Sequence, residues 1–274
     1  DHPEVIFIHG SFDAALLDDS SIKAVFKSPG LSPAQVKSVW TATQQKGMWH
    51  GTELTLFAHA MDSLAKAQAY QPHVVAITGT NGKTTVTALT SLLLKRAGMT
   101  VAMAGNIGPT LLDTLRENLA HLPQAWVLEL SSFQLDGETQ FEPTAACVLN
   151  LTQDHLDWHA DMQSYGAAKS RIYGQHAIAV MPRHDESVAA LLPKDLGKKK
   201  SEKRKLSKLS DRTVVHASAS CEEDDEDVLA KHDRLMATPQ GTSEALDKEK
   251  EADSFAQEAL RKVSSEVLSV TLKA

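Results

Sequence analysis

The residues best suited to chemistry lie in one short turn that reads Gly-Thr-Asn-Gly-Lys-Thr-Thr. An apolar run precedes this turn and a helical pattern follows it. Glycines let backbone amides approach phosphate oxygens, and a helix N-terminus adds partial positive charge. The turn therefore predicts a loop that binds a nucleoside triphosphate, with an ordinary turn as the alternative. Its predicted contacts are Gly79, Thr80, Asn81, Gly82, Lys83, Thr84 and Thr85.

Lys83 and Thr84 have separate expected tasks in this loop. A lysine at this position reaches the β- and γ-phosphates, and the hydroxyl that follows it binds Mg²⁺. The spacing is shorter than the standard phosphate-loop pattern, because Ile77 stands where that pattern has its first glycine. The position between a strand and a helix is what makes the prediction specific.

A carboxylate closes the apolar run at residues 125–128. Glu129 lies at the end of the predicted strand, one strand–helix unit after the phosphate loop. Carboxylates at this place hold Mg²⁺ in nucleotide sites. The alternative is an ordinary exposed glutamate, but beside Lys83 and Thr84 we favour the metal.

Two further strand ends carry polar groups. Asn150, Asp154 and His155 follow the predicted strand at residues 145–150. A neutral imidazole binds a metal or orients a phosphate oxygen, whereas Asp154 could equally cap a turn. Asn106 follows another strand, where it could meet an anionic substrate or belong to a plain turn.

Lys169 falls on an apolar helical stripe. It lies four residues after Tyr165 and three before Ile172, so the three side chains share one face. A lysine that points inward must snorkel, pair with a carboxylate or change its chemistry. The predicted metal site on the same side favours a functional role as much as snorkelling.

These residues require alternating strands and helices to bring them together. The pattern predicts an α/β fold with a mostly parallel sheet, in which ligands bind at the carboxyl ends of the strands. The predicted strands are residues 74–78, 100–104, 125–130, 145–150 and 177–181. The predicted helices are residues 83–97, 109–120 and 161–173.

Composition excludes several classes of protein. The 274 residues carry a net charge of −7, which argues against non-specific nucleic-acid binding. The first residues lack the basic and apolar pattern of a secretory leader, and we expect no membrane span, because no apolar run approaches roughly 20 residues. Two cysteines are too few for a disulfide framework. We expect a cytoplasmic protein, and a monomer.

Three regions differ in composition. Residues 1–70 contain strand patterns at 5–8 and 24–26 and a helical face over 54–64. Residues 71–192 hold the strand–helix units. Residues 193–274 contain basic and acidic runs with one aromatic residue, Phe255, and predict a disordered, low-complexity charged tail.

Taken together, these motifs resemble the Mur ligase family of ATP-dependent enzymes. The similar segments are residues 77–85, 105–108, 129–135, 149–157 and 165–173. The segment Glu-Leu-Ser-Ser-Phe-Gln-Leu at 129–135 points to the members that add D-glutamate. The resemblance extends over about residues 28–192. It implies a partial Rossmann-like domain that binds a nucleotide sugar before an incomplete central ATP-binding domain.

The resemblance also implies roles for single residues. Thr84 and Glu129 are similar to Mg²⁺ ligands, and His155 to a ligand of a second Mg²⁺. Lys169 matches a carbamylated lysine that supports this metal, so the implied catalytic set is Lys83, His155 and Lys169. The implied substrate contacts are Gly30, Asn106, Ser131, Gln134 and His155.

The implied reaction joins D-glutamate to UDP-N-acetylmuramoyl-L-alanine through an acyl phosphate, with ATP and Mg²⁺ as cofactors and no nucleic-acid or membrane partner. The family also carries a C-terminal domain that binds the incoming amino acid, and the resemblance fades near residue 185. We therefore expect either a ligase or a truncated, catalytically impaired module that binds ATP or the nucleotide sugar. A third alternative, an unrelated phosphate-loop NTPase, leaves residues 129, 155 and 169 unexplained.

Overall fold

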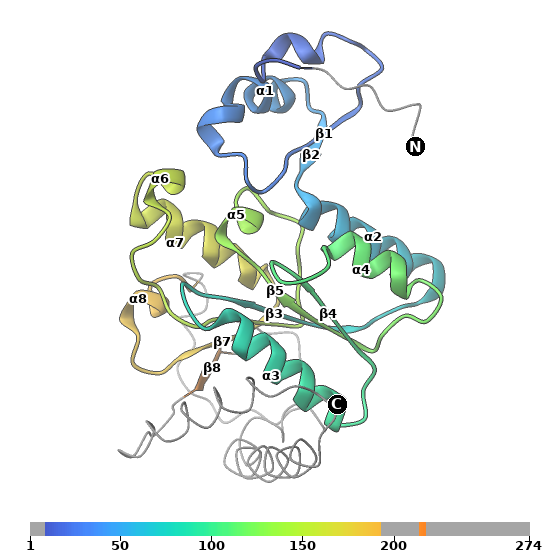
Figure 1. Ribbon diagram of the computed structural model, residues 1–274, viewed down its shortest axis with the longest axis vertical. Coiled ribbons are helices and arrows are strands. Elements are labelled where there is room, and N and C mark those ends of the chain that lie inside the picture. The colour runs from blue at the N-terminus through green and yellow to red at the C-terminus, as the bar shows by residue number, and fades with distance from the viewer. Residues whose placement is uncertain (1–8, 193–213, 218–274) are drawn as a thin grey trace, which may run out of the picture. The chain divides into compact units, whose positions relative to one another are not determined.

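The computed structural model describes residues 9–192 and 214–217. Within them, a six-stranded parallel sheet has the order β4-β5-β3-β6-β7-β8 (Figure 1). Its strands are β3 (His73–Thr78), β4 (Val101–Gly105), β5 (Ala125–Glu129), β6 (Ala145–Val148), β7 (Ile178–Pro182) and β8 (Val214–Ala217). The predicted α/β class with a parallel sheet is confirmed.

Helices cover both faces of this sheet. Figure 1 shows α3 across one face and α2 and α4 on the other. The helices are α1 (Pro33–Gln45), α2 (Glu53–Gln68), α3 (Lys83–Arg96), α4 (Leu111–Asn118), α5 (Ser132–Leu135), α6 (Leu156–His159), α7 (Met162–Ser170) and α8 (Glu186–Ala189). Two 3₁₀ helices are η1 (Ala14–Leu17) and η2 (Arg171–Tyr173).

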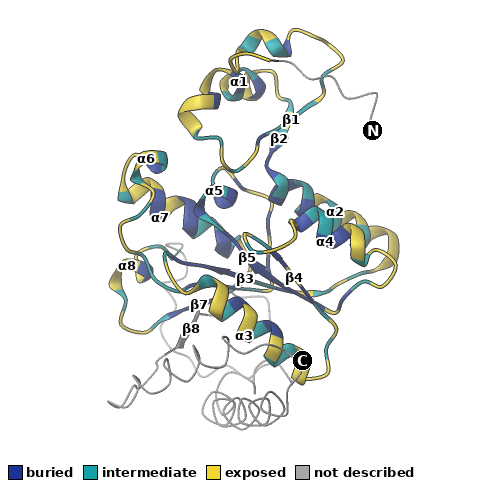
Figure 2. Ribbon diagram, viewed as in Figure 1, coloured by how far each residue is buried: buried dark blue, intermediate teal, exposed yellow. Residues whose placement is uncertain are grey.

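Hydrophobic burial holds the sheet together. Every residue of β5 is buried, as expected for a strand with parallel neighbours and helices on both faces (Figure 2). Trp126 packs edge-on against Phe57 of α2, with ring centroids 5.2 Å apart. The indole also donates a 2.9 Å hydrogen bond to the Tyr70 hydroxyl. This core fixes β5, and therefore the place where β5 ends.

The register aligns the ends of four strands. Ile77 of β3 lies opposite Glu129 of β5, which lies opposite Gly105 of β4. On the other side, Ile77 lies opposite Cys147 of β6. Residues that follow these four strands therefore gather along one edge of the sheet, which we call the rim.

The N-terminal part contains a second, small sheet. β1 (Ala24–Phe26) pairs in parallel with β2 (Trp49–Gly51), and α1 connects them. The strand at 24–26 and the helix around 54–64 were predicted, whereas α1 and β2 were not. A capping box between Ser32 and Gln35 starts α1, with Pro33 at its first position. That Ser-Pro-x-Gln signal was available in the sequence.

The apolar stripe of α3 is not its inward face. The spacing puts Val86, Leu89 and Leu93 on one side of the helix, but Leu89 is 46% exposed. The helix instead buries Thr87 and Ser91. The phosphate loop fixes the rotation of α3 at its start, and small side chains allow close packing beneath it.

The C-terminal prediction is also corrected in part. Residues 214–217, which we assigned to a disordered tail, form β8 and pair with β7. The sheet thus has one more strand than we expected. The strand pattern at 5–8 and the rest of the segment after residue 192 lie outside the described residues.

Gly105 offers a test of how the rim is built. A Cβ at this position would lie 2.1 Å from the Glu129 carbonyl oxygen, and φ is +116°. We expect Gly105→Ala to lower the free energy of unfolding by about 3 kcal/mol or more, because both backbone conformation and contact are unfavourable. Gly98 is the control, since its φ is +86° and nothing lies within 4 Å of its Cβ position.

Urea unfolding of the two variants measures this difference. Gly98→Ala should cost about 1 kcal/mol through conformation alone. Equal losses in the two variants would show that β4 does not approach β5 closely at this point.

Candidate active site

The phosphate loop, residues 79–85, is braced by the strand end beside it. The backbone amides of Thr80 and Asn81 donate to Asn150 Oδ1 at 3.0 and 2.9 Å. The side-chain Nδ2 of Asn150 donates a 3.1 Å hydrogen bond to the Asn81 backbone carbonyl. A side chain at the end of β6 therefore sets the shape of the loop between β3 and α3.

Two lysines converge on one carbonyl of this loop. Lys83 Nζ donates to the Gly79 oxygen at 3.0 Å and to the Thr80 oxygen at 2.9 Å. Lys169 Nζ donates to the same Gly79 oxygen at 2.9 Å and to Thr78 Oγ1 at 3.3 Å. The start of the loop thus concentrates positive charge, which favours an anionic ligand there.

Thr84 and Glu129 meet directly. The Thr84 hydroxyl donates to Glu129 Oε2 at 2.8 Å, and Asn106 Nδ2 donates to Oε1 at 3.1 Å. The Glu129 residue is 1% exposed, so its carboxylate depends on these donors. The last residue of β5 therefore meets groups that follow β3 and β4. The sequence predicted Glu129 beside Thr84, whereas the bond from Asn106 was not predicted.

Lys169 is fully buried, as its position on the α7 stripe predicted. It is 1% exposed, and its ammonium lies 4.7 Å from the Tyr165 ring centroid. Burial, and after it the charge of Lys83, lowers the pKa of Lys169 to about 7, while the charge of Asp154 opposes the shift. Near neutral pH, this amine is therefore available in its uncharged form.

His155 lies at the start of α6 in a constrained backbone conformation, with φ of +52°. Its Nε2 lies 3.4 Å from Asp154 Oδ2, and its ring centroid is 4.7 Å from that of Phe133. Tyr165 links it to the phosphate loop: the two rings are 6.2 Å apart, and the Tyr165 hydroxyl lies 3.2 Å from Thr80 Oγ1. The imidazole is thus connected to the loop through one intervening side chain.

Ser131 and Gln134 already satisfy one another. The Ser131 backbone N–H donates to Gln134 Oε1 at 3.1 Å, and the Gln134 backbone N–H donates to Ser131 Oγ at 3.2 Å. This capping box starts α5. Gly30 lies in the exposed turn after β1, in the N-terminal part. The substrate contacts predicted for these three residues stay predictions.

Sequence reasoning did not assign Asn150 and Tyr165 the bracing roles that the structure gives them. Asn150 was noted as a polar residue at a strand end, and that place was the available signal. Tyr165 was read only as a member of an apolar stripe, because spacing does not show that its hydroxyl reaches Thr80.

The described residues contain no cluster of three or more His, Cys, Asp or Glu side chains that could hold a metal. The Thr84 hydroxyl and Glu129 carboxylate nevertheless fit Mg²⁺, which prefers oxygen ligands and takes most of its shell from water and phosphate.

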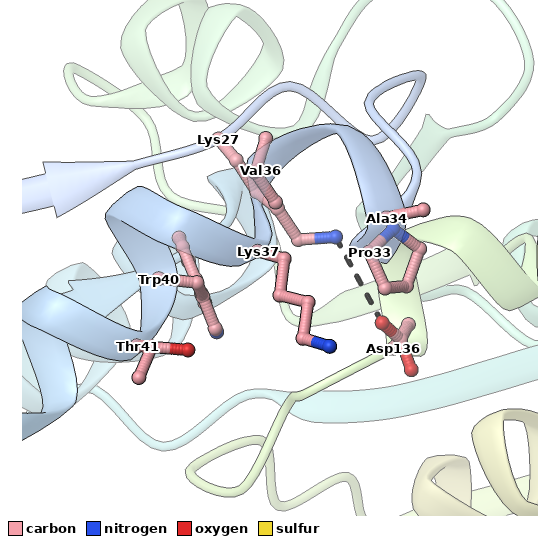
Figure 3. A pocket seen from close by; sticks show the side chains of 8 residues that line it. All are labelled: Lys27, Pro33, Ala34, Val36, Lys37, Trp40, Thr41 and Asp136. Atoms are coloured by element: carbon pink, nitrogen blue, oxygen red, sulfur yellow. Dashed lines mark ion pairs between the residues drawn. The ribbon is translucent and has the colours of Figure 1, made fainter. Parts of the chain in front are cut away.

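A cavity of about 350 Å³ lies elsewhere, lined by residues of α1, Lys27 and Asp136 (Figure 3). In the part of the chain that the structure describes, no helix has the length and apolar character to cross a bilayer.

Comparison with known proteins now defines the class. The family model for the Mur ligase middle domain matches residues 77–245. The chain belongs to the Mur ligase family. This match continues past residue 192, where we had expected the resemblance to end, and it includes β8.

The similar curated proteins are named for the addition of D-glutamate. The chain is 56% identical over 193 residues to UDP-N-acetylmuramoylalanine--D-glutamate ligase of Albidiferax ferrireducens, covering 70% of this chain and 38% of that protein. The identity to the Burkholderia thailandensis protein of the same name is 50% over 191 residues, covering 68% and 38%. The chain thus spans about two fifths of the length of these relatives.

A similar solved structure is a UDP-N-acetylmuramoyl-L-alanyl-D-glutamate--2,6-diaminopimelate ligase. It covers 61% of this chain and 42% of its own, with 20% identity and a TM-score of 0.42. At that score the likeness adds nothing to the argument from residues.

The pKa of Lys169 gives a pH-dependent prediction. The folded chain releases this proton near pH 7 and the unfolded chain near 10.5, so the unfolded state binds more protons between these values. The free energy of unfolding should therefore rise with pH across that window, by about 1 kcal/mol per pH unit at most.

Urea unfolding in CO₂-free buffer tests this prediction. Lys169→Met should remove the rise, whereas Lys66→Met, at an exposed position of α2, should retain it. Parallel pH profiles for the unsubstituted chain and Lys169→Met would show that the lysine titrates normally.

Proposed function

We propose that this chain provides the ATP-binding part of a ligase that joins D-glutamate to UDP-N-acetylmuramoyl-L-alanine. The observation that carries the proposal is the Thr84–Glu129 hydrogen bond of 2.8 Å beside two buried or half-buried lysines. A hydroxyl, a carboxylate and ammonium groups at one rim suit the activation of a carboxylate by ATP. The identity to D-glutamate ligases supports the choice of substrates.

In the proposed complex, the phosphate loop holds ATP. Lys83 Nζ would exchange its contacts with the Gly79 and Thr80 carbonyls for phosphate oxygens. Thr84 and Glu129 would hold Mg²⁺, which when bound neutralises phosphate charge. Asn106, already bonded to Glu129, keeps that carboxylate oriented.

Lys169 supports a covalent modification. Its uncharged amine would attack the carbon of CO₂, forming an N–C bond and releasing a proton to solvent. The product is a carbamate anion next to Lys83, where a negative charge is favourable. The modification would account for the buried Lys169 ammonium, whose hydrogen bonds within the described residues go to the Thr78 hydroxyl and the Gly79 carbonyl and to no carboxylate. His155 would be a ligand of a second Mg²⁺ on the same side of the site as this carbamate.

The proposed reaction has two steps. A substrate carboxylate oxygen attacks the γ-phosphorus of ATP, and ADP leaves with the electrons of the broken P–O bond. The amine of D-glutamate then attacks the acyl carbon, phosphate leaves, and loss of a proton gives the amide. Both partners of the first step are anions, so the ammonium of Lys83 lowers their repulsion.

The nucleotide sugar is expected to contact the N-terminal part and the rim. In this proposal residues 1–70 form part of a Rossmann-like nucleotide-sugar domain, and residues 71–192 contribute the central domain. Gly30, Asn106, Ser131, Gln134 and His155 are its proposed contacts. We retain a monomeric, cytoplasmic protein as the working expectation.

A second candidate is a binding module without ligation. The chain spans 38% of the length of its relatives, and the resemblance implies that a separate C-terminal domain binds the incoming amino acid. Lys83, Thr84 and Glu129 at the rim are proposed contacts of ATP and Mg²⁺. The described rim residues therefore support nucleotide binding as the second candidate.

Nucleotide affinity tests the role of the loop. Lys83→Ala should weaken Mg·ATP binding by at least about 100-fold, because a charge-assisted contact to phosphate is lost. Lys95→Ala, at the exposed far end of the same helix, is the matched control and should bind normally. Isothermal titration measures both, and unchanged affinity in Lys83→Ala would remove the phosphate-loop assignment.

Phosphate release separates the two candidates. With UDP-N-acetylmuramoyl-L-alanine, D-glutamate and Mg·ATP, we expect the isolated chain to bind ATP but release little or no phosphate in a D-glutamate-dependent manner. Robust D-glutamate-dependent turnover would establish the ligase and reject the binding module.

A further inference from the structure

Lys27 is a buried lysine outside the site described above. It follows β1, and its backbone amide donates to the Gly51 carbonyl at 3.0 Å. The residue is 8% exposed. Burial lowers the pKa of Lys27, and the charge of Asp136 opposes that shift. A cation in such a place requires specific partners to offset its desolvation.

Those partners are the Leu31 carbonyl, to which Lys27 Nζ donates at 3.5 Å, and side chains in or next to three helices. The ammonium lies 5.8 Å from the Trp40 ring centroid in α1 and 5.1 Å from the Trp158 ring centroid in α6. It also lies 3.8 Å from Asp136 Oδ2, at the end of α5 (Figure 3). Cation–π contacts of this kind contribute about 0.5 to 2 kcal/mol each.

Two of these helices carry rim residues. Trp158 lies three residues after His155, in the single turn of α6. Asp136 follows α5, whose first turn holds Ser131 and Gln134. One ammonium group, that of Lys27, therefore joins the N-terminal part to α5 and α6, the two short helices next to the proposed substrate contacts.

α6 is a short turn held by contacts from several elements, among them a 2.9 Å hydrogen bond between His159 Nε2 and Ser132 Oγ. It has four residues between two non-glycine residues of positive φ, His155 and Ala160. Within the described part of the chain, the buried Trp158 Nε1 has no hydrogen-bond partner. The indole is held by ring contacts, at 4.8 Å from Phe133 and 4.4 Å from His159. The contact with Lys27 is the one that ties the Trp158 indole to the segment that follows β1.

We propose that Lys27 is a positioning residue for the nucleotide-sugar substrate, which acts by holding α5 and α6 through Asp136 and Trp158. The proposal rests on the proposed function for the identity of that substrate. Lys27 itself makes no contact with the phosphate loop in this account. Replacing Lys27 should therefore disturb the proposed substrate contacts on α5 and α6. It should leave the phosphate loop and its ATP affinity unchanged.

Lys27 can be replaced without leaving the Asp136 carboxylate buried and unsolvated. Lys27 and Asp136 line the cavity of about 350 Å³, so water can solvate the carboxylate when the ammonium is removed (Figure 3). Lys37 lines the same cavity from the exposed side of α1 and serves as the matched control. Lys27→Met keeps the length of the side chain, and Lys27→Arg keeps its charge.

Hydrogen exchange of the α6 amides gives the first measurement. The amides of Trp158, His159 and Ala160 donate to carbonyls at the start of that turn, at 3.0 to 3.1 Å. We expect Lys27→Met to speed their exchange by about tenfold, with Lys27→Arg and Lys37→Met close to the unsubstituted chain. Asp136→Asn, which removes only the paired charge, should speed exchange to a smaller extent.

Binding gives the second measurement. Lys27→Met should weaken the affinity for UDP-N-acetylmuramoyl-L-alanine by about tenfold and leave the affinity for Mg·ATP unchanged, and Lys27→Arg should restore most of the loss. Unchanged α6 exchange in Lys27→Met would overturn the proposal. Uniformly faster exchange in α6 and β5, in both Lys27→Met and Asp136→Asn, would also overturn it by showing a general stabilising role.

The two failures are distinguishable. If the unsubstituted chain binds no nucleotide sugar, the proposed substrate is wrong, and α6 exchange still decides whether Lys27 holds the turn. If that chain binds the nucleotide sugar and Lys27→Met binds it equally well, the positioning role is wrong and the proposed function stands.

Discussion

The carboxylate of Glu129 is buried at the end of β5, between β4 and β3, and the rest of the site depends on its hydrogen bonds. It needs donors, and it receives them from Thr84 and Asn106. Those residues follow β3 and β4, the two neighbours of β5. One buried charge therefore ties three strand ends together. A change in strand register would separate the carboxylate from its donors, so the sheet and the site specify one another.

The other side of the rim carries the opposite charge. Lys83 and Lys169 both donate to the Gly79 carbonyl, and Lys169 has no room to reach water. Two ammonium groups at this separation are unfavourable without an anion. A polyphosphate beside Lys83, and a carbamate on Lys169, would each relieve that repulsion. The electrostatics of the described residues thus point toward the same chemistry as the family membership.

Much of this could be predicted from sequence because the motifs follow strands that belong to one parallel sheet. The loop at 79–85, the end of β5 and the inward lysine of α7 all depend on local pattern plus one topological rule. The face of α3 could not be predicted from its leucines, because the loop sets the rotation of the helix and Thr87 and Ser91 pack beneath it. Lys27 was missed since its partners, Asp136 and Trp158, lie more than one hundred residues along the chain. β8 was missed because charged runs surround it.

The most direct test is a structure of the chain with Mg²⁺ and an ATP analogue that resists hydrolysis. We predict that a γ-phosphate oxygen lies within hydrogen-bond distance of Lys83 Nζ, with Mg²⁺ bound by Thr84 Oγ1 and the Glu129 carboxylate. A nucleotide bound on another surface, or a metal that contacts neither residue, would contradict it.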